Sequence, residues 1–229
     1  MYEQFIRRYG GNPSIKVCLD AYVERAYITA IESAFEALRS PQGAGFELVL
    51  IAMLCMQKAG KGFTVQARDL GQEALTSPEY PMWDKELVKV VLGTTDLDRI
   101  LERLPQEAPN VVASSLGLVG DRECKRCQAY YYHGARLMLL DSTKDGRGFL
   151  REAILIGAAS MVEFELAIAQ LEENAEEDLD MAYVCLGHGY LDLLLRNDLG
   201  QAREAEKAFA RIGATRELRV VQGLIARRN

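Results

Sequence analysis

The stretch CQAYYYHGARLMLL, residues 127–140, places three consecutive tyrosines ahead of a glycine in a segment with the composition of a helix. A glycine inside a helix costs about 1 kcal/mol relative to alanine. We expect close packing to offset this cost at Gly134, because a residue without a side chain lets a second helix approach and gain contacts. The glycine therefore predicts a tight helix pair.

A second stretch, AYVCLGHGY at residues 182–190, repeats the spacing of the first. In each, an aromatic residue is followed after two residues of any type by a bulky residue and a glycine. A large apolar residue follows after two more residues of any type. The first set is Tyr130, His133, Gly134 and Leu137, and the second is Tyr183, Leu186, Gly187 and Tyr190. Candidate second helices follow, with Gly146, Leu150 and Ala153 in one and Ala205, Phe209 and Ile212 in the other.

This pattern resembles the tetratricopeptide repeat, whose first helix reads W-x₂-L-G-x₂-Y and whose second carries A-x₃-F. The resemblance covers residues 124–229 and, more loosely, residues 46–80. The tail ARIGATRELRVVQGLIARRN looks like the capping helix that closes such arrays. His133 replaces the usual leucine, and the distance from glycine to second helix differs between the two copies. The resemblance implies an all-α fold of antiparallel helix hairpins stacked as a right-handed superhelix, or solenoid.

Helical spacing also dominates the rest of the chain, and strand signals are weak. Residues 21–40 carry one apolar stripe that Pro41 ends, and helices are predicted at 46–59 and 65–75, with the GKG at 60–62 as the break between them. The later helices are predicted at 124–140, 147–157, 160–174, 178–196, 200–212 and 215–228. We expect an N-terminal helical region over 1–104 with one loose hairpin, a boundary region over 105–123, and repeats over 124–229.

Bulk composition excludes several classes of protein. The 229 residues carry a net charge of −6, which does not suit a nucleic-acid-binding surface. The longest apolar run, residues 46–56, is far shorter than the roughly 20 residues of a membrane span. Five scattered cysteines suit a reducing compartment better than a disulfide framework, and the N-terminus lacks the apolar core of a secretory signal. The sequence predicts a cytoplasmic protein.

No catalytic signature stands out. The chain has no Gly-x₄-Gly-Lys-Ser/Thr loop, no G-x-S-x-G elbow and no H-E-x-x-H motif. Cys124 and Cys127 with Cys185 and His188 are zinc ligands by type, but two predicted helices separate the pairs, and packed helix axes lie about 8–10 Å apart. We expect no metal, no cofactor and no catalytic residues, and interpret the cysteines and both histidines, His133 and His188, as packing or surface residues.

The acidic run EENAEEDLD, residues 172–180, admits two interpretations. It straddles the end of one predicted helix and the start of the next, where carboxylates favour the N-terminal turn. We interpret it as a solvated connector. The alternative is a docking patch for a basic partner.

The repeat resemblance implies a concave groove lined by the first helix of each hairpin, of a width that takes an extended peptide or a helix. The residues that the resemblance places in the groove are Tyr131, Ala135, Met138, Val184, His188, Leu191 and Asp192. The Lys and Asn set that clamps a C-terminal carboxylate in some family members is absent. We expect a non-catalytic scaffold or adaptor that binds a peptide or helix of another protein, and no nucleic acid or membrane.

Two alternatives remain open at this point. Similar repeats accompany DNA-binding or protease domains in bacterial regulators, so the chain could be a regulatory or sensor module that acts in trans on a separate effector. An enzyme with an unfamiliar site around His133 and the cysteines is the third hypothesis. The sequence names neither the partner nor the oligomeric state.

Overall fold

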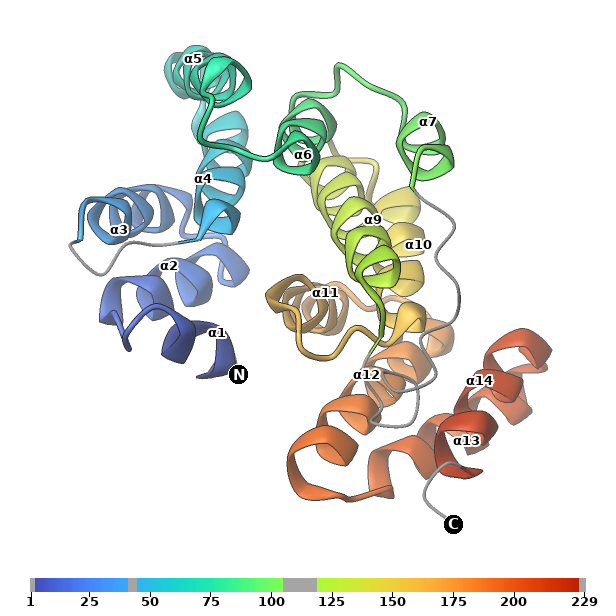
Figure 1. Cartoon of the computed structure of the whole chain (residues 1–229). Coiled ribbons are helices and arrows are strands. Elements are labelled where there is room, and N and C mark those ends of the chain that lie inside the picture. Colours follow the sequence, from blue (N-terminus) through green and yellow to red (C-terminus); the bar gives the residue numbers. More distant parts are fainter. Residues whose placement is uncertain (1–2, 41–44, 105–118, 227–229) are drawn as a thin grey trace. The chain divides into compact units, whose positions relative to one another are not determined.

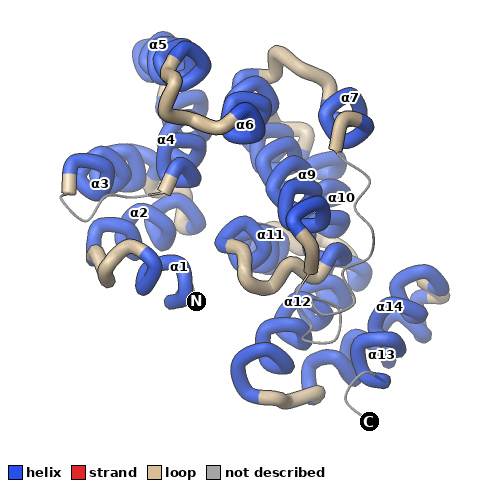
Figure 2. Tube along the Cα trace, viewed as in Figure 1, coloured by secondary structure: helices blue, strands red, loops and turns tan. Residues whose placement is uncertain are grey.

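A computed structural model describes residues 3–40, 45–104 and 119–226. Within these ranges the secondary structure consists of α-helices joined by turns and loops, with no β-strand (Figure 2). The prediction of an all-α fold is confirmed. No helix in the described ranges combines the length and the apolar character that crossing a bilayer requires.

The chain divides into two compact units, and the first is discontinuous in sequence. Unit 1 comprises Met1–Arg103 with Ala135–Thr143, and unit 2 comprises Leu104–Gly134 with Lys144–Asn229. The helices of the first stretch are α1 (Glu3–Arg8), α2 (Pro13–Val23), α3 (Tyr27–Arg39), α4 (Phe46–Ala59), α5 (Lys61–Thr76), α6 (Met82–Leu92) and α7 (Leu97–Glu102) (Figure 1). The later helices are α9 (Asp121–Leu139), α10 (Thr143–Ile156), α11 (Val162–Glu173), α12 (Asp178–Arg196), α13 (Gly200–Ile212) and α14 (Thr215–Ala226). Most of the predicted boundary region, residues 105–118, lies outside the described residues.

Helix α4 forms the centre of unit 1. Every side chain from Leu48 to Met56 is buried, as expected of a helix that is apolar on all sides. Helices α3 and α5 both pack against it, and α6 contacts α4 and α5. Gly71 of α5 makes the approach close, because a Cβ built there would lie 2.9 Å from both Met53 and Leu92 side-chain atoms.

The single stripe predicted over residues 21–40 is wrong, because two helices share it. Helix α2 ends in a Schellman motif, in which the Ala26 N–H donates to Ala21 O at 2.8 Å and the Arg25 N–H donates to Tyr22 O at 3.2 Å. Arg25 adopts φ +60°, a left-handed conformation that glycine usually supplies. The apolar spacing continues across the turn, so the pattern gave no sign of the break.

Most other predicted helices are confirmed, with shifted ends. Helices α4, α12 and α13 match their predicted ranges. Helix α5 begins at Lys61, because Gly60 alone, at φ +130°, separates it from α4. Helix α10 begins at Thr143, four residues before its predicted start, and includes Gly146 and Gly148.

Glycines set the close helix contacts of unit 2, as the sequence predicts for Gly134. A Cβ on Gly134 would lie 3.0 Å from Gly146 O and 3.2 Å from Leu150 N, so α9 meets the backbone of α10 there. Gly187 does not play the matching role, because its Cβ would meet Ile168 and Ile154 side chains of α11 and α10. Gly189 takes that role in the next pair, with a Cβ position 2.8 Å from Ala202 N of α13. The two copies of the sequence pattern are thus offset by two residues.

Candidate functional site

The seven residues predicted to line a groove fall into two groups by burial. Tyr131, Ala135 and Val184 are buried, with exposed fractions of 0%, 1% and 2%. The four that remain partly exposed are Met138, His188, Leu191 and Asp192. Only the four partly exposed residues can contact a partner without a change in packing. The three buried residues therefore do not line an open groove, contrary to the prediction.

The burial of Tyr131 follows from the crowding of α9. Its ring lies edge-on to that of Tyr132, with centroids 5.0 Å apart, and both side chains are fully buried. Tyr130 instead stacks on Phe149 of α10, at 6.2 Å. A truncation of Tyr131 would open a cavity and lower the stability of the protein, so it cannot serve as a test of binding.

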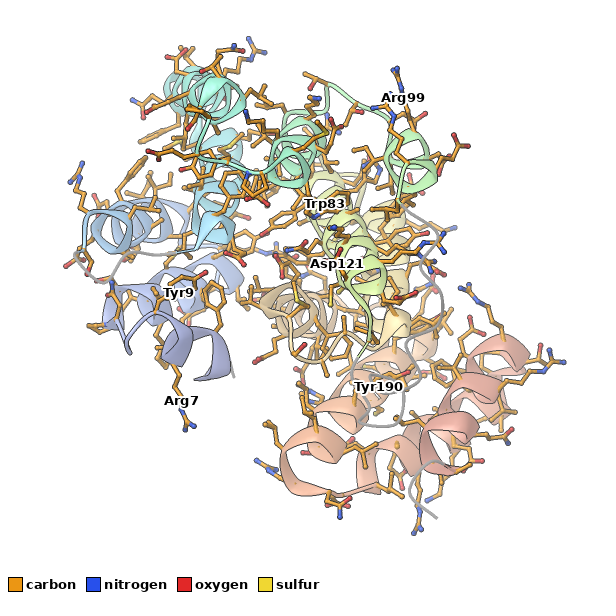
Figure 3. All side chains as sticks on the ribbon, viewed as in Figure 1. Arg7, Tyr9, Trp83, Arg99, Asp121 and Tyr190 are labelled. Carbon is orange, nitrogen blue, oxygen red and sulfur yellow. The ribbon has the colours of Figure 1, made fainter. Side chains whose placement is uncertain are left out.

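The predicted residues also divide between the two units. Ala135 and Met138 belong to unit 1, whereas Tyr131 and the four residues of α12 belong to unit 2. The partly exposed residues His188, Leu191 and Asp192 share the C-terminal half of α12. Four of the seven predicted residues thus lie on α12, the helix whose Tyr190 is labelled in Figure 3.

One face of α12 is at least partly exposed from Met181 to Leu195, and we call it the α12 stripe. It consists of Met181, Cys185, His188, Asp192 and Leu195, which recur at intervals of three and four residues. Met181 is 45% exposed and Leu195 is 60% exposed, while the other three are half-buried. The 14 residues between the ends of the stripe correspond to about 21 Å of helix.

The C-terminal end of α12 adds further apolar surface. Leu194 is 38% exposed and Leu191 is half-buried beside the stripe. Together with Leu195 they form an apolar patch at this end of the helix. Single exposed leucines are common on protein surfaces, but a group of three indicates a contact surface. The helix ends at Asn197, which adopts φ +56°.

Carboxylates flank the stripe on both sides. Glu172 of α11 places Oε2 3.7 Å from His188 Nε2. Burial raises the pKa of the Cys185 thiol, and the charges of Glu204 on α13 and Glu172 on α11 raise it further. Both neighbouring helices thus direct negative charge at the middle of the stripe, and Cys185 remains a neutral thiol at physiological pH.

The acidic run 172–180 is only partly a solvated connector, and the prediction is wrong for Asp180. This side chain is fully buried, and Arg151 Nε donates to its Oδ1 at 2.7 Å. Arg147, itself buried, places Nε 3.3 Å from Asp180 Oδ2 and Nη1 2.7 Å from Glu176 Oε1. Asp180 also accepts from the backbone N–H of Glu177 in a capping box that starts α12.

This ion-pair network is structural rather than catalytic. Asp180 Oδ1 accepts from Arg151, and Oδ2 accepts from the backbone N–H groups of Glu176 and Glu177 and lies 3.3 Å from Arg147 Nε. The network therefore fixes the start of α12 on α10 and leaves the remaining exposed carboxylates of the run, such as Asp178, on the surface.

Glu163 is a buried carboxylate that the sequence analysis missed. It lies fully buried on α11, and Gln128 Nε2 and Tyr132 Oη donate to its Oε1 at 3.1 and 3.2 Å. Burial raises the pKa of the adjacent Cys127 thiol, and the charge of Glu163 adds to that effect. An acidic residue inside the apolar run MVEFELAIA is the signal that could have identified it.

The cysteines and histidines do not assemble into a metal centre in the described part of the chain. No group of three or more His, Cys, Asp or Glu side chains has a suitable arrangement there. His133 packs edge-on against Phe149 at 4.5 Å instead.

Comparisons with known proteins add no relative. Neither the family models, nor the curated proteins, nor the solved structures gave a match to this chain.

Proposed function

We propose that this protein is a non-catalytic scaffold or adaptor that binds a segment of another protein on the α12 stripe. The observation that carries the proposal is the partly exposed face of α12, with Met181 and Leu195 exposed at its two ends and half-buried residues between them. A helix whose other faces are packed by α11 and α13, and which still presents apolar residues to solvent, has a surface suited to a partner.

The hairpin architecture supports this proposal. Close backbone contacts at Gly134 and Gly189 join α9 to α10 and α12 to α13, as expected of stacked helix pairs in a tetratricopeptide-like solenoid. In such an array the face of each first helix that is not packed against its neighbours lines the concave surface that binds ligands. Helix α12 is the first helix of its pair, and its outer face is the α12 stripe.

The energetic basis of binding is the burial of apolar side chains. Fully burying a Leu or Met side chain contributes about 1.5–3 kcal/mol. Leu195 and Met181 are each about half exposed, so each contributes roughly half of this amount when a partner covers it. These contacts, with Leu191 and Leu194, suit a transient, reversible complex after the entropic cost of association is subtracted.

Site-specific photo-crosslinking in the native cell tests the proposal. A benzoylphenylalanine replaces Leu195, and a matched control replaces Val65 of α5, which is 57% exposed. We expect one protein to crosslink from position 195 and not from position 65. An empty result at position 195, or the same set of proteins at both positions, would overturn the assignment of the stripe.

A further inference from the structure

The polypeptide around the α12 stripe is far more acidic than the chain as a whole. Residues 160–204 contain eleven Asp and Glu residues but only two arginines and no lysine, a net charge of −9. The whole chain has a net charge of −6, so the rest of the chain is slightly basic. Part of this charge is paired with basic groups outside the segment, because Arg147 and Arg151 of α10 pair with Glu176, Glu177 and Asp180. Glu172 and Glu204 lie beside the stripe itself.

The charged groups beside the stripe come from all three helices. Helix α11 supplies Glu172, α12 supplies Asp192, and α13 supplies Glu204. The basic groups close to them are occupied: Arg196 Nη1 lies 3.4 Å from Asp192, and Lys207 Nζ lies 2.8 Å from Glu204. Glu172, whose side chain is 51% exposed, has only His188 within ion-pair distance among these helices. The residues of α11, α12 and α13 together carry a net charge of −5, so negative charge remains in excess around the stripe although Asp192 and Glu204 are paired.

We propose that the α12 stripe receives a basic amphipathic helix of a partner protein, an inference that rests on the proposed function. The apolar side chains of such a helix pack on Met181, Leu191 and Leu195. Its lysine or arginine side chains reach over both edges of the stripe to Glu172 on one side and Glu204 on the other. The arrangement is the helix-in-groove mode of recognition with charge at the rim.

The length of the stripe fits a short partner helix. Its exposed residues recur with the three- and four-residue spacing of one helix face over about 21 Å. A partner helix of about 14 residues presents apolar side chains along the same length. The excess of negative charge disfavours nucleic acid and anionic membranes, both of which would be repelled.

The chain's own basic C-terminal helix is not a suitable occupant. Arg216 of α14 already pairs with Glu152, with Nη1 2.8 Å from Oε1. The apolar face of α14 is also in use, because Val221 and Leu224 are buried. The α14 helix of a second copy could therefore occupy the stripe only after leaving its own packing.

A model peptide tests the proposal directly. The probe is a fluorescein-labelled 18-residue peptide of leucine and lysine, with leucines on one helical face. Its controls are a peptide of the same composition in scrambled order and a peptide with glutamate in place of lysine. Binding to the full chain is followed by fluorescence anisotropy at low and high salt. We expect the amphipathic lysine peptide alone to bind with defined stoichiometry, and its affinity to fall as salt rises.

Three double variants separate the apolar and charged contributions. Leu191→Ser with Leu195→Ser should weaken binding about tenfold, because the apolar end is lost. Glu172→Gln with Glu204→Gln should weaken binding about 3- to 10-fold and reduce its salt dependence. The matched control, Asp69→Asn with Glu73→Gln on α5, removes two exposed carboxylates from unit 1 and should leave binding unchanged.

The outcomes distinguish this inference from the proposed function. Equal losses of affinity in the α5 control and the stripe variants would show that the peptide binds by general charge attraction. That result would overturn the inference. Binding of the glutamate peptide, or of the scrambled peptide, would do the same. Self-association of the chain that the Glu172→Gln, Glu204→Gln variant abolishes would assign the stripe to a second copy. A specific crosslink at position 195 with no peptide binding would retain the scaffold and reject the basic helix.

Discussion

The contact at Gly189 offers the sharpest test of the packing in unit 2. The perturbation is Gly189→Ala, which adds one methyl group to α12. Its Cβ would lie 2.8 Å from the backbone N of Ala202, 2.9 Å from its Cα and 3.0 Å from its Cβ. Two of these atoms are backbone, so α13 itself must move to make room.

Two effects of opposite sign decide the magnitude. Alanine gains about 1 kcal/mol over glycine in a helix interior. Overpacking a close contact costs about 1–3 kcal/mol, and a contact with backbone atoms belongs to the upper part of this range. We expect Gly189→Ala to lower the free energy of unfolding by about 1–2 kcal/mol.

Gly148→Ala is the matched control. Gly148 lies inside α10, and no heavy atom lies within 4 Å of its Cβ position. This substitution keeps the propensity gain without the clash and should stabilise the protein by about 1 kcal/mol. Urea-induced unfolding of both variants and the parent, followed by circular dichroism at 222 nm, measures the difference. The reasoning fails if Gly189→Ala is at least as stable as the parent while Gly148→Ala is stabilised.

Three further predictions concern other parts of the fold. Asp180→Ala removes the acceptor that Arg147 and Arg151 share and the capping box of α12, but leaves Arg147 paired with Glu176, so it should cost about 2–4 kcal/mol in urea unfolding. An equal loss on truncating the exposed Asp178 would refute a special role for Asp180. Burial raises the pKa of Cys18 from 9.0 to about 12, so the unfolded thiol ionises first and stability should fall between these pH values by about 1.4 kcal/mol per unit. Alkaline titration of Cys18→Ala should show a shallower fall, and an unchanged slope would contradict the assignment. Gly93→Ala should cost about 1 kcal/mol or more in thermal unfolding, because φ is +69° and its Cβ would displace the Arg136 guanidinium; a gain in stability would contradict it.

The sequence alone predicted features that depend on local pattern. Apolar spacing and helix-breaking residues located most helices, and the helix cost of Gly134 predicted its close approach to α10. The C-terminal end of α9 was harder to predict, because the turn that follows it has Asp141 at φ +64° instead of a glycine. The same limitation concealed the break at Arg25.

The burial of particular side chains depended on long-range contacts that no local pattern reveals. Three consecutive tyrosines span about 200° of a helix, so the sequence could not decide which of them faces a neighbour. Tyr131 and Tyr132 are buried, whereas Tyr130 remains partly exposed. Asp180 looks like its acidic neighbours, and only the arginines 29 and 33 residues earlier in the chain distinguish it.

The sequence offset between the two glycine contacts has a similar origin. Gly187 matched the repeat pattern, but its Cβ position faces Ile168 and Ile154, and Gly189 instead lies against the backbone of α13. Gly189 lies two residues after Gly187 and therefore on a different face of α12, where it provides the close contact that the pattern assigned to Gly187. The pattern therefore identified the correct helix and the wrong contact.

The discontinuity of unit 1 decides how this protein can be dissected. A fragment that ends at residue 104 lacks Ala135–Thr143, which contribute to the same unit. In the intact chain Lys58 Nζ donates to Leu139 O at 2.9 Å and pairs with Asp141 at 3.1 Å. The N-terminal fragment would lose these partners and expose apolar surface, so it should be recovered intact only when residues 135–143 are supplied with it as a separate peptide or a grafted extension.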